Sequence, residues 1–135
     1  PETQVVLPLL ETDIMDIIEA VWEEKLDTLD IKWSDKSCAC VVMASGGYPE
    51  KYETGKVISG LDENGQCEGA FVYHAGTKLE DGKFLTAGGR VLGITAYGDT
   101  LKEALDTAYK AVDTISFEKA HYRHDIGKKA LSALK

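Results

Sequence analysis

Cysteine is scarce in this sequence, and no long apolar run is present. Three cysteines in 135 residues are too few for the disulfide framework of a small secreted domain. The odd number and the apolar surroundings of Cys38, Cys40 and Cys67 indicate free thiols in a reducing compartment, and no Cys-x-x-Cys pair supports a zinc site. No apolar run approaches the ~20 residues that a membrane-spanning helix needs. These shortages predict a cytoplasmic protein without a membrane segment.

Basic residues are also in short supply. Lys and Arg number 15 against 23 Asp and Glu, which gives a net charge of -8. A nucleic-acid surface needs clustered Lys and Arg, and an anionic membrane attracts the same residues, so neither is an expected partner. The length of 135 residues, with 44% hydrophobic and 28% charged residues, fits one soluble globular domain. The first residue is not methionine, so we expect a chain that is processed or cut from a longer one.

Hydrophobic periodicity separates a helical start from a mainly β middle. Apolar residues at helical spacing predict a helix over about 12–25, and the polar segment after it places a mild boundary at about residue 33. Beyond this boundary the apolar period shortens to two, which predicts strands over 37–45, 56–61, 69–76 and 90–98. Asp81-Gly82 between two extended runs predicts a hairpin within 77–86.

The C-terminal part returns to helical spacing. A second helix is expected over about 100–115, begun by a capping box of Thr100 and Glu103. A short helix that Asp125 caps is expected in the tail. The order of helix, about five short strands, helix and short helix predicts an α+β fold, in which an antiparallel β-sheet is flanked by helices.

Two glycine pairs stand at predicted strand ends. Gly46, Gly47 and Tyr48 follow the first strand, either as an ordinary turn or as a loop whose backbone amides approach a ligand. Gly88 and Gly89 precede Arg90, and glycine amides beside a guanidinium suit a phosphate or carboxylate. A bulge followed by a surface arginine explains the second pair equally well.

The remaining polar residues name no reaction. His74 fits a hydrogen-bonded turn, while His121 and His124 have metal-ligand spacing but no third ligand in view. The sequence has no serine nucleophile elbow, no Walker-type glycine loop and no His-Glu-x-x-His motif. The residues alone therefore predict a domain with glycine-rich strand ends but do not identify a reaction.

Six short motifs occur together in a recognisable order. PETQ, ASGGYP, TGKVISGL, VYHAGTK, GGRVLGITAYG and YRHDIG extend from Pro1 to about Leu131. In this order and at these spacings they closely resemble the C-terminal third of the glycinamide ribonucleotide synthetase family, also called phosphoribosylamine–glycine ligases. Any one motif is weak, whereas six in register are specific.

The resemblance implies a reaction, and it implies that parts of the active site lie outside this chain. Members of this ATP-grasp family join glycine to 5-phosphoribosylamine in purine biosynthesis. ATP is cleaved to ADP and phosphate through a glycyl phosphate, and Mg²⁺ or Mn²⁺ bridges the ATP phosphates. The expected metal ligands and the nucleotide grip lie upstream of Pro1. We therefore expect this chain to bind neither ATP nor metal and to be inactive alone, because phosphoryl transfer needs phosphates, metal and acceptor held together.

The resemblance also implies domains. Residues 1–33 would be the tail of the ATP-grasp domain, and residues 34–135 the small barrel-like C-terminal domain that forms one wall of the cleft. In the longer protein, the helix over 12–25 would pack on the ATP-grasp sheet. In the isolated chain its apolar stripe either folds onto the antiparallel sheet or stays exposed and promotes dimers.

Candidate substrate-binding residues follow from the same resemblance. The motifs that face the cleft contribute Gly46, Gly47, Tyr48, Arg90, Arg123 and Asp125. Glu2, Thr3 and Gln4 lie next to the absent metal ligands. Arg123 precedes the expected start of the tail helix, where an anion is favoured. Two other interpretations stay open, a stand-alone module that binds a small anion and a structural domain without a ligand.

Overall fold

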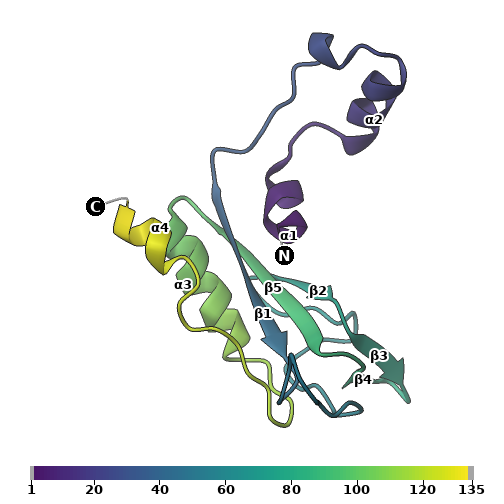
Figure 1. The fold of residues 1–135 in the computed structure, drawn as a ribbon, viewed down its shortest axis with the longest axis vertical. Coiled ribbons are helices and arrows are strands. Elements are labelled where there is room, and N and C mark those ends of the chain that lie inside the picture. The colour runs from purple at the N-terminus through teal and green to yellow at the C-terminus, as the bar shows by residue number, and fades with distance from the viewer. Residues whose placement is uncertain (1, 134–135) are drawn as a thin grey trace.

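The computed structural model describes residues 2–133 and shows an antiparallel sheet with helices on both faces (Figure 1). The elements in chain order are α1 (Thr3–Val6), the 3-10 helix η1 (Leu7–Leu9), α2 (Ile14–Trp22), the 3-10 helix η2 (Leu26–Thr28), β1 (Ser37–Ala44), β2 (Phe71–His74), β3 (Thr77–Glu80), β4 (Lys83–Thr86), β5 (Arg90–Gly98), α3 (Leu101–Val112) and α4 (Lys128–Ala133). The predicted α+β class with an antiparallel sheet and flanking helices is confirmed.

The centre of the fold is the pairing of β1 with β5. The main sheet has the order β1-β5-β2, and both neighbours run antiparallel to β5. The β1–β5 register runs from Ser37 opposite Gly98 to Met43 opposite Leu92, and an irregularity then brings Ala44 opposite Arg90. Such a bulge re-aims the side chains beyond it. The end of β1 is therefore the place where the regular alternation of the sheet is broken.

Different segments of the chain pack on the two faces of this sheet. Val41, Met43, Leu92 and Ile94 are buried in the main core together with Val112 of α3. Cys40 and Val42 alternate with these residues on β1 and so point to the opposite face. On that opposite face, near the other end of the sheet, the hydroxyl of Tyr97 donates a hydrogen bond to the carbonyl of Pro8 at 3.0 Å. Helix α3 thus covers one face, and the segment of α1 and η1 covers part of the other.

The second sheet is the predicted hairpin. Strands β3 and β4 pair antiparallel, and the two residues between them, Asp81 and Gly82, have φ angles of 50° and 72°. Two central residues with positive φ are typical of the turn that matches the twist of a hairpin. This prediction from the Asp-Gly pair is confirmed.

The strand predicted over 56–61 is wrong. This segment makes only isolated bridges, from Val57 to Leu85 of β4 and from Ser59 to Ser116 beyond α3. It cannot form a continuous ladder because it changes partner within two residues and then turns at Gly60, whose φ is 91°. A further bridge joins Ala44 to His121. Together these bridges form an interrupted ring from β4 back to β1, which is barrel-like without being a closed sheet among residues 2–133.

The N-terminal helices differ from expectation in two respects. The short helices α1 and η1 were not predicted, because PETQVVLPLL has no apolar period and contains a proline. The predicted helix over 12–25 is shorter and spans Ile14–Trp22, with the Asp13 carboxylate accepting the Met15 N–H at 2.8 Å. Its apolar stripe does not fold onto the sheet: Figure 1 shows α2 apart from it, and Trp22 is 88% exposed.

The C-terminal helices are also shorter than expected. Helix α3 ends at Val112, and its predicted capping box is confirmed, since Thr100 and Glu103 exchange both hydrogen bonds. Helix α4 begins at Lys128, so Asp125 does not cap it. Gly127 lies between Asp125 and the start of α4, and its φ of 75° is incompatible with a helix that continues through this position.

Removal of the α3 cap should lower stability. Thr100→Ala deletes the oxygen that accepts the Glu103 N–H. We expect the free energy of unfolding in urea to fall by about 1 kcal/mol. Thr100→Ser keeps an acceptor and should retain most of the stability. Equal unfolding midpoints for the Ala and Ser variants would contradict this role.

Candidate functional site

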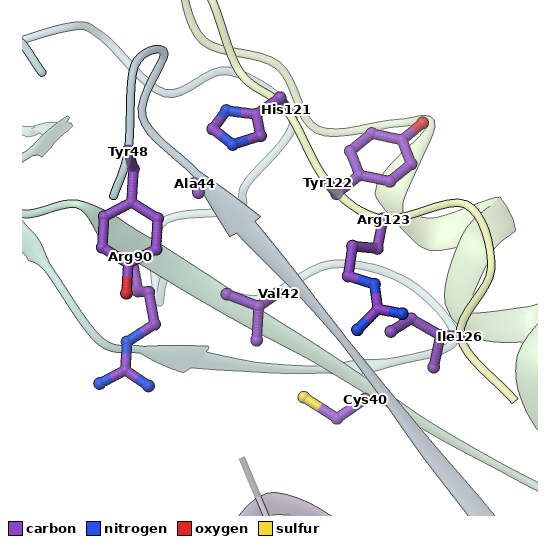
Figure 2. Close-up of a pocket in the computed structure, with 9 residues that line it drawn as sticks. All are labelled: Cys40, Val42, Ala44, Tyr48, Arg90, His121, Tyr122, Arg123 and Ile126. Atoms are coloured by element: carbon purple, nitrogen blue, oxygen red, sulfur yellow. The ribbon is translucent and has the colours of Figure 1, made fainter. Parts of the chain in front are cut away.

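A cavity of about 270 Å³ opens where β1 ends, on the sheet face that α3 does not cover. Figure 2 shows its floor on β1, with arginines from two other segments at its sides. Its lining residues are Cys40, Val42 and Ala44 of β1, Tyr48 of the following loop, Arg90 of β5, and His121, Tyr122, Arg123 and Ile126 of the segment before α4. The cavity therefore brings together Tyr48, Arg90 and Arg123 from the sequence-predicted site.

The two glycine loops meet beside this cavity. Ser45 joins them, since its N–H donates to the Gly89 carbonyl and its hydroxyl donates to the Gly88 carbonyl, both at 2.8 Å. A Cβ on Gly89 would lie 2.3 Å from the Tyr48 ring. The bare backbone at Gly89 thus lets the Tyr48 ring lie directly against the start of β5.

Gly46 and Gly47 have a structural explanation. A Cβ on Gly47 would lie 2.2 Å from the carbonyl oxygen of Lys51, and the φ of Gly47 is 95°. A Cβ on Gly46 would lie 2.5 Å from the Cβ of Lys119. Gly47 needs glycine for the turn itself, whereas Gly46 needs it because Lys119 approaches closely, and neither residue lines the cavity. The turn and the packing of Lys119 thus account for this pair, while the tyrosine that follows lines the cavity.

Arg90 and Arg123 line opposite sides of the cavity (Figure 2). Within residues 2–133, Arg90 makes no side-chain hydrogen bond and no ion pair. Arg123 makes a bidentate pair with Asp125, at 2.9 Å from Nε to Oδ1 and 2.8 Å from Nη2 to Oδ2. This hydrogen-bonded contact raises the pKa of Arg123 and lowers the pKa of Asp125. The cavity therefore holds one arginine without a counter-ion and one that is already neutralised.

A tyrosine that the sequence reasoning missed fixes the segment around Arg123. The Tyr109 hydroxyl donates to the Arg123 carbonyl at 2.7 Å and accepts the Ile126 N–H at 3.2 Å. Tyr109 lies on α3, four residues after the buried Leu105. A tyrosine within the apolar stripe of a helix usually directs its hydroxyl to a partner, and this was the available signal.

The floor of the cavity adds no charge. Burial raises the pKa of the Cys40 thiol, so this group stays protonated at neutral pH. Val42 and Ala44 complete an apolar floor beneath the two guanidinium groups. Cations above an apolar floor suit an anion that is bound at one end, such as a phosphate or carboxylate carried by a small organic molecule.

The other candidate residues lie elsewhere. Glu2, Thr3 and Gln4 lie in and just before α1, outside the cavity lining. His74 is held in a turn, since Nε2 lies 2.8 Å from the Gly65 carbonyl and Nδ1 lies 2.7 Å from the Thr77 hydroxyl. The carbonyl can only accept, so Nε2 carries the proton. This matches the turn expected for His74.

The described part of the chain contains neither a metal-binding cluster nor a membrane-spanning helix. No group of three or more His, Cys, Asp or Glu side chains in residues 2–133 is arranged to hold a metal ion. His124 instead packs against Tyr122, with ring centroids 4.6 Å apart. Among these residues no helix has the length and apolar character needed to cross a bilayer.

Comparison with known sequences assigns the family. The sequence profile described as phosphoribosylglycinamide synthetase, C domain, matches residues 38–129. The chain belongs to this family. A phosphoribosylamine–glycine ligase of Caldanaerobacter subterraneus is 54% identical over 126 residues, which cover 93% of this chain and 30% of that protein. A bifunctional purine biosynthetic protein of Dictyostelium discoideum is 49% identical, over 99% of this chain and 17% of that protein.

A solved relative has the same fold. The crystal structure of a phosphoribosylamine–glycine ligase from Thermotoga maritima matches with a TM-score of 0.71 and 32% identity, over 93% of this chain and 30% of that one. The chain thus spans about 30% of the length of single-enzyme synthetase relatives. The motif-based resemblance to the C-terminal third of this family is confirmed.

The Tyr109 contacts predict a local effect. Tyr109→Phe keeps the ring but removes both hydrogen bonds to the 123–126 segment, so the free energy of unfolding should fall by about 1 kcal/mol. Hydrogen exchange at the Ile126 amide should become faster. Tyr97→Phe, which loses a hydroxyl bonded to Pro8, is the matched control and should leave exchange at Ile126 unchanged. Identical hydrogen exchange at Ile126 in both variants would refute the role of the Tyr109 hydroxyl in holding the 123–126 segment.

Proposed function

We propose that this chain is the C-terminal portion of an ATP-dependent ligase that joins glycine to 5-phosphoribosylamine. The products are glycinamide ribonucleotide, ADP and phosphate, in de novo purine biosynthesis. The observation that carries the proposal is the match of residues 38–129 to the synthetase C domain, together with relatives named phosphoribosylamine–glycine ligase. The three free cysteines fit a cytoplasmic enzyme.

The proposal includes two structural parts. Residues 1–33 form the tail of the ATP-grasp domain, and residues 34–135 form the C-terminal domain. The start of the family match at residue 38 and the position of α2 away from the sheet support this division. In the longer ligase, Glu2, Thr3 and Gln4 then lie close to the ATP-binding part, although they are far in sequence from the cavity residues.

We place the phosphate of phosphoribosylamine in the cavity at the end of β1. Arg90 is its main anchor, because this guanidinium has no counter-ion within residues 2–133. Tyr48 and Arg123 complete the site, and the Gly46-Gly47 turn presents Tyr48. The cavity offers binding groups but no metal cluster and no activated nucleophile. ATP with Mg²⁺ or Mn²⁺, and the bond-forming step, therefore belong in this proposal to the part of the ligase outside this chain.

Kinetics of the full-length ligase test this placement. Arg90→Ala should raise the KM for phosphoribosylamine by about tenfold, since a hydrogen-bonded charge contact is lost in a cavity open to water. The KM for ATP should not change. Lys102→Ala removes a cation on α3 that pairs with Asp106 and is the control. The 135-residue chain alone should release no ADP above background. A larger effect on ATP than on phosphoribosylamine would refute the assignment of the site.

We further propose that the exposed stripe of α2 is an internal interface of the longer ligase. Five large apolar side chains of this helix are between 46% and 88% exposed: Ile14, Met15, Ile18, Val21 and Trp22. A continuous apolar surface of this kind is normally covered by another part of a protein. In the isolated chain, a second copy can cover it.

Sedimentation of the isolated chain tests this interface. We expect concentration-dependent dimers for the 135-residue chain. Ile18→Lys places a charge within the stripe and should yield monomers, because an unpaired charge is costly to bury. Glu19→Lys, on the same helix but outside the stripe, should still dimerise. Monomers of the unaltered chain at all concentrations would eliminate self-association.

A further inference from the structure

The two arginines of the cavity are not equivalent, and the difference lies in Asp125. The Asp125 carboxylate is two residues from Arg123 and accepts two hydrogen bonds from its guanidinium group. These bonds run from Nε to Oδ1 at 2.9 Å and from Nη2 to Oδ2 at 2.8 Å. Arg90 has no such partner within residues 2–133. An anion that enters the cavity therefore meets one guanidinium that is ready to bind and one that must first leave its own carboxylate.

We infer that Asp125 is an internal competitor that sets the affinity and selectivity of the anion site. In this assignment, which rests on the proposed phosphate site, Asp125 acts through Arg123 and does not touch the substrate. A phosphate displaces the carboxylate and takes over the Arg123 fork. Asp125 is thus a specificity-determining residue whose removal strengthens binding.

The exchange is physically accessible. The side chains of Arg123 and Asp125 are 73% and 54% exposed, and an ion pair with this exposure is weak because water screens it. The pair is also strictly local, since the two residues are only two positions apart. Its rupture requires rotation of two side chains and no movement of a core element.

The backbone around the pair stays in place during the exchange. The Tyr109 hydroxyl holds the Arg123 carbonyl and the Ile126 N–H, on either side of Asp125. The guanidinium can therefore change partner while the origin of its side chain remains fixed. Loss of the carboxylate should leave Arg123 at the cavity rather than release the whole segment.

The competition favours a phosphate over a carboxylate. A phosphate group carries up to two negative charges and three acceptor oxygens, whereas a carboxylate offers the charge and geometry that Asp125 already provides. A carboxylate ligand gains little from Arg123 in exchange for Asp125. A phosphate gains a second cation in addition to Arg90, and the site discriminates accordingly.

The test is anion binding by the 135-residue chain, followed by NMR at constant ionic strength. Inorganic phosphate and acetate are the probes. Asp125→Asn should tighten phosphate binding by roughly two- to fivefold, the factor that corresponds to loss of an exposed ion pair. Acetate binding should tighten by at least as much, so the preference for phosphate over acetate should fall. A gain of affinity cannot arise from an unfolded protein.

Two controls isolate the mechanism. Asp106→Asn removes the same charge and breaks an exposed pair with Lys102 outside the cavity lining, so phosphate affinity should not change. In an Arg123→Ala background, Asp125→Asn should tighten phosphate binding less than in the unaltered chain, because only the screened repulsion between carboxylate and anion remains. Should Asp125→Asn fail to fold, Asp125→Ser replaces it with the same expectation. Unchanged phosphate affinity, equal tightening by Asp106→Asn, or equally strong tightening by Asp125→Asn without Arg123 would each overturn the inference.

The outcome is separable from that of the proposed function. Tighter phosphate binding in a chain whose full-length protein lacks ligase activity would support the role of Asp125 and refute the ligase. Ligase activity that depends on Arg90, with unchanged phosphate affinity in Asp125→Asn, would support the ligase and refute the competitor.

Discussion

The rest of the structure depends on the antiparallel pairing of β1 with β5. This ladder creates two faces from one alternating pattern, so that Val41 and Met43 enter the core under α3 while Cys40 and Val42 face the cavity. Its irregular end, where Ala44 lies opposite Arg90, turns an apolar ladder into the edge of a charged site. Without the ladder, the glycine loops, the arginines and the bridge to His121 would have no common support.

Charge is distributed in a way that fits this architecture. The chain has a net charge of -8, yet its only two arginines both line one cavity. The two guanidinium groups thus place local positive charge in a chain whose net charge is negative. The neutral Cys40 thiol and the apolar floor leave the two guanidinium groups as the permanently charged groups that line the cavity.

The elements that were predicted well have a local cause. The Asp81-Gly82 turn, the Thr100 capping box and the apolar run of β5 are each decided by neighbours in sequence, and all three are present in the structure. The 56–61 segment has the composition of a strand but divides its bridges between two distant partners, which no local pattern reveals. The prediction that Asp125 caps the tail helix was wrong for a similar reason, because Asp125 pairs with Arg123 and the helix begins only at Lys128.

The candidate site was predictable only in part. Glycine next to arginine indicated an anion, and Tyr48, Arg90 and Arg123 do meet in one cavity. The sequence could not reveal that Tyr109 holds the segment of Arg123, because the two are linked only through tertiary packing of the tail on α3. The sequence also could not show that Gly46 and Gly47 lie outside the cavity while Tyr48, which follows them, lines it.

The register of the central ladder has a consequence for how the chain acquires its structure. Ser37 pairs with Gly98, so almost the whole middle of the domain lies between the two halves of the main ladder. Contacts between such distant residues form late, because a long loop must close first. During synthesis on a ribosome, the apolar β1 emerges long before β5 and has no partner to pair with. The order of the elements along the chain therefore requires β1 to remain unpaired, and exposed to wrong partners, until β5 has been made.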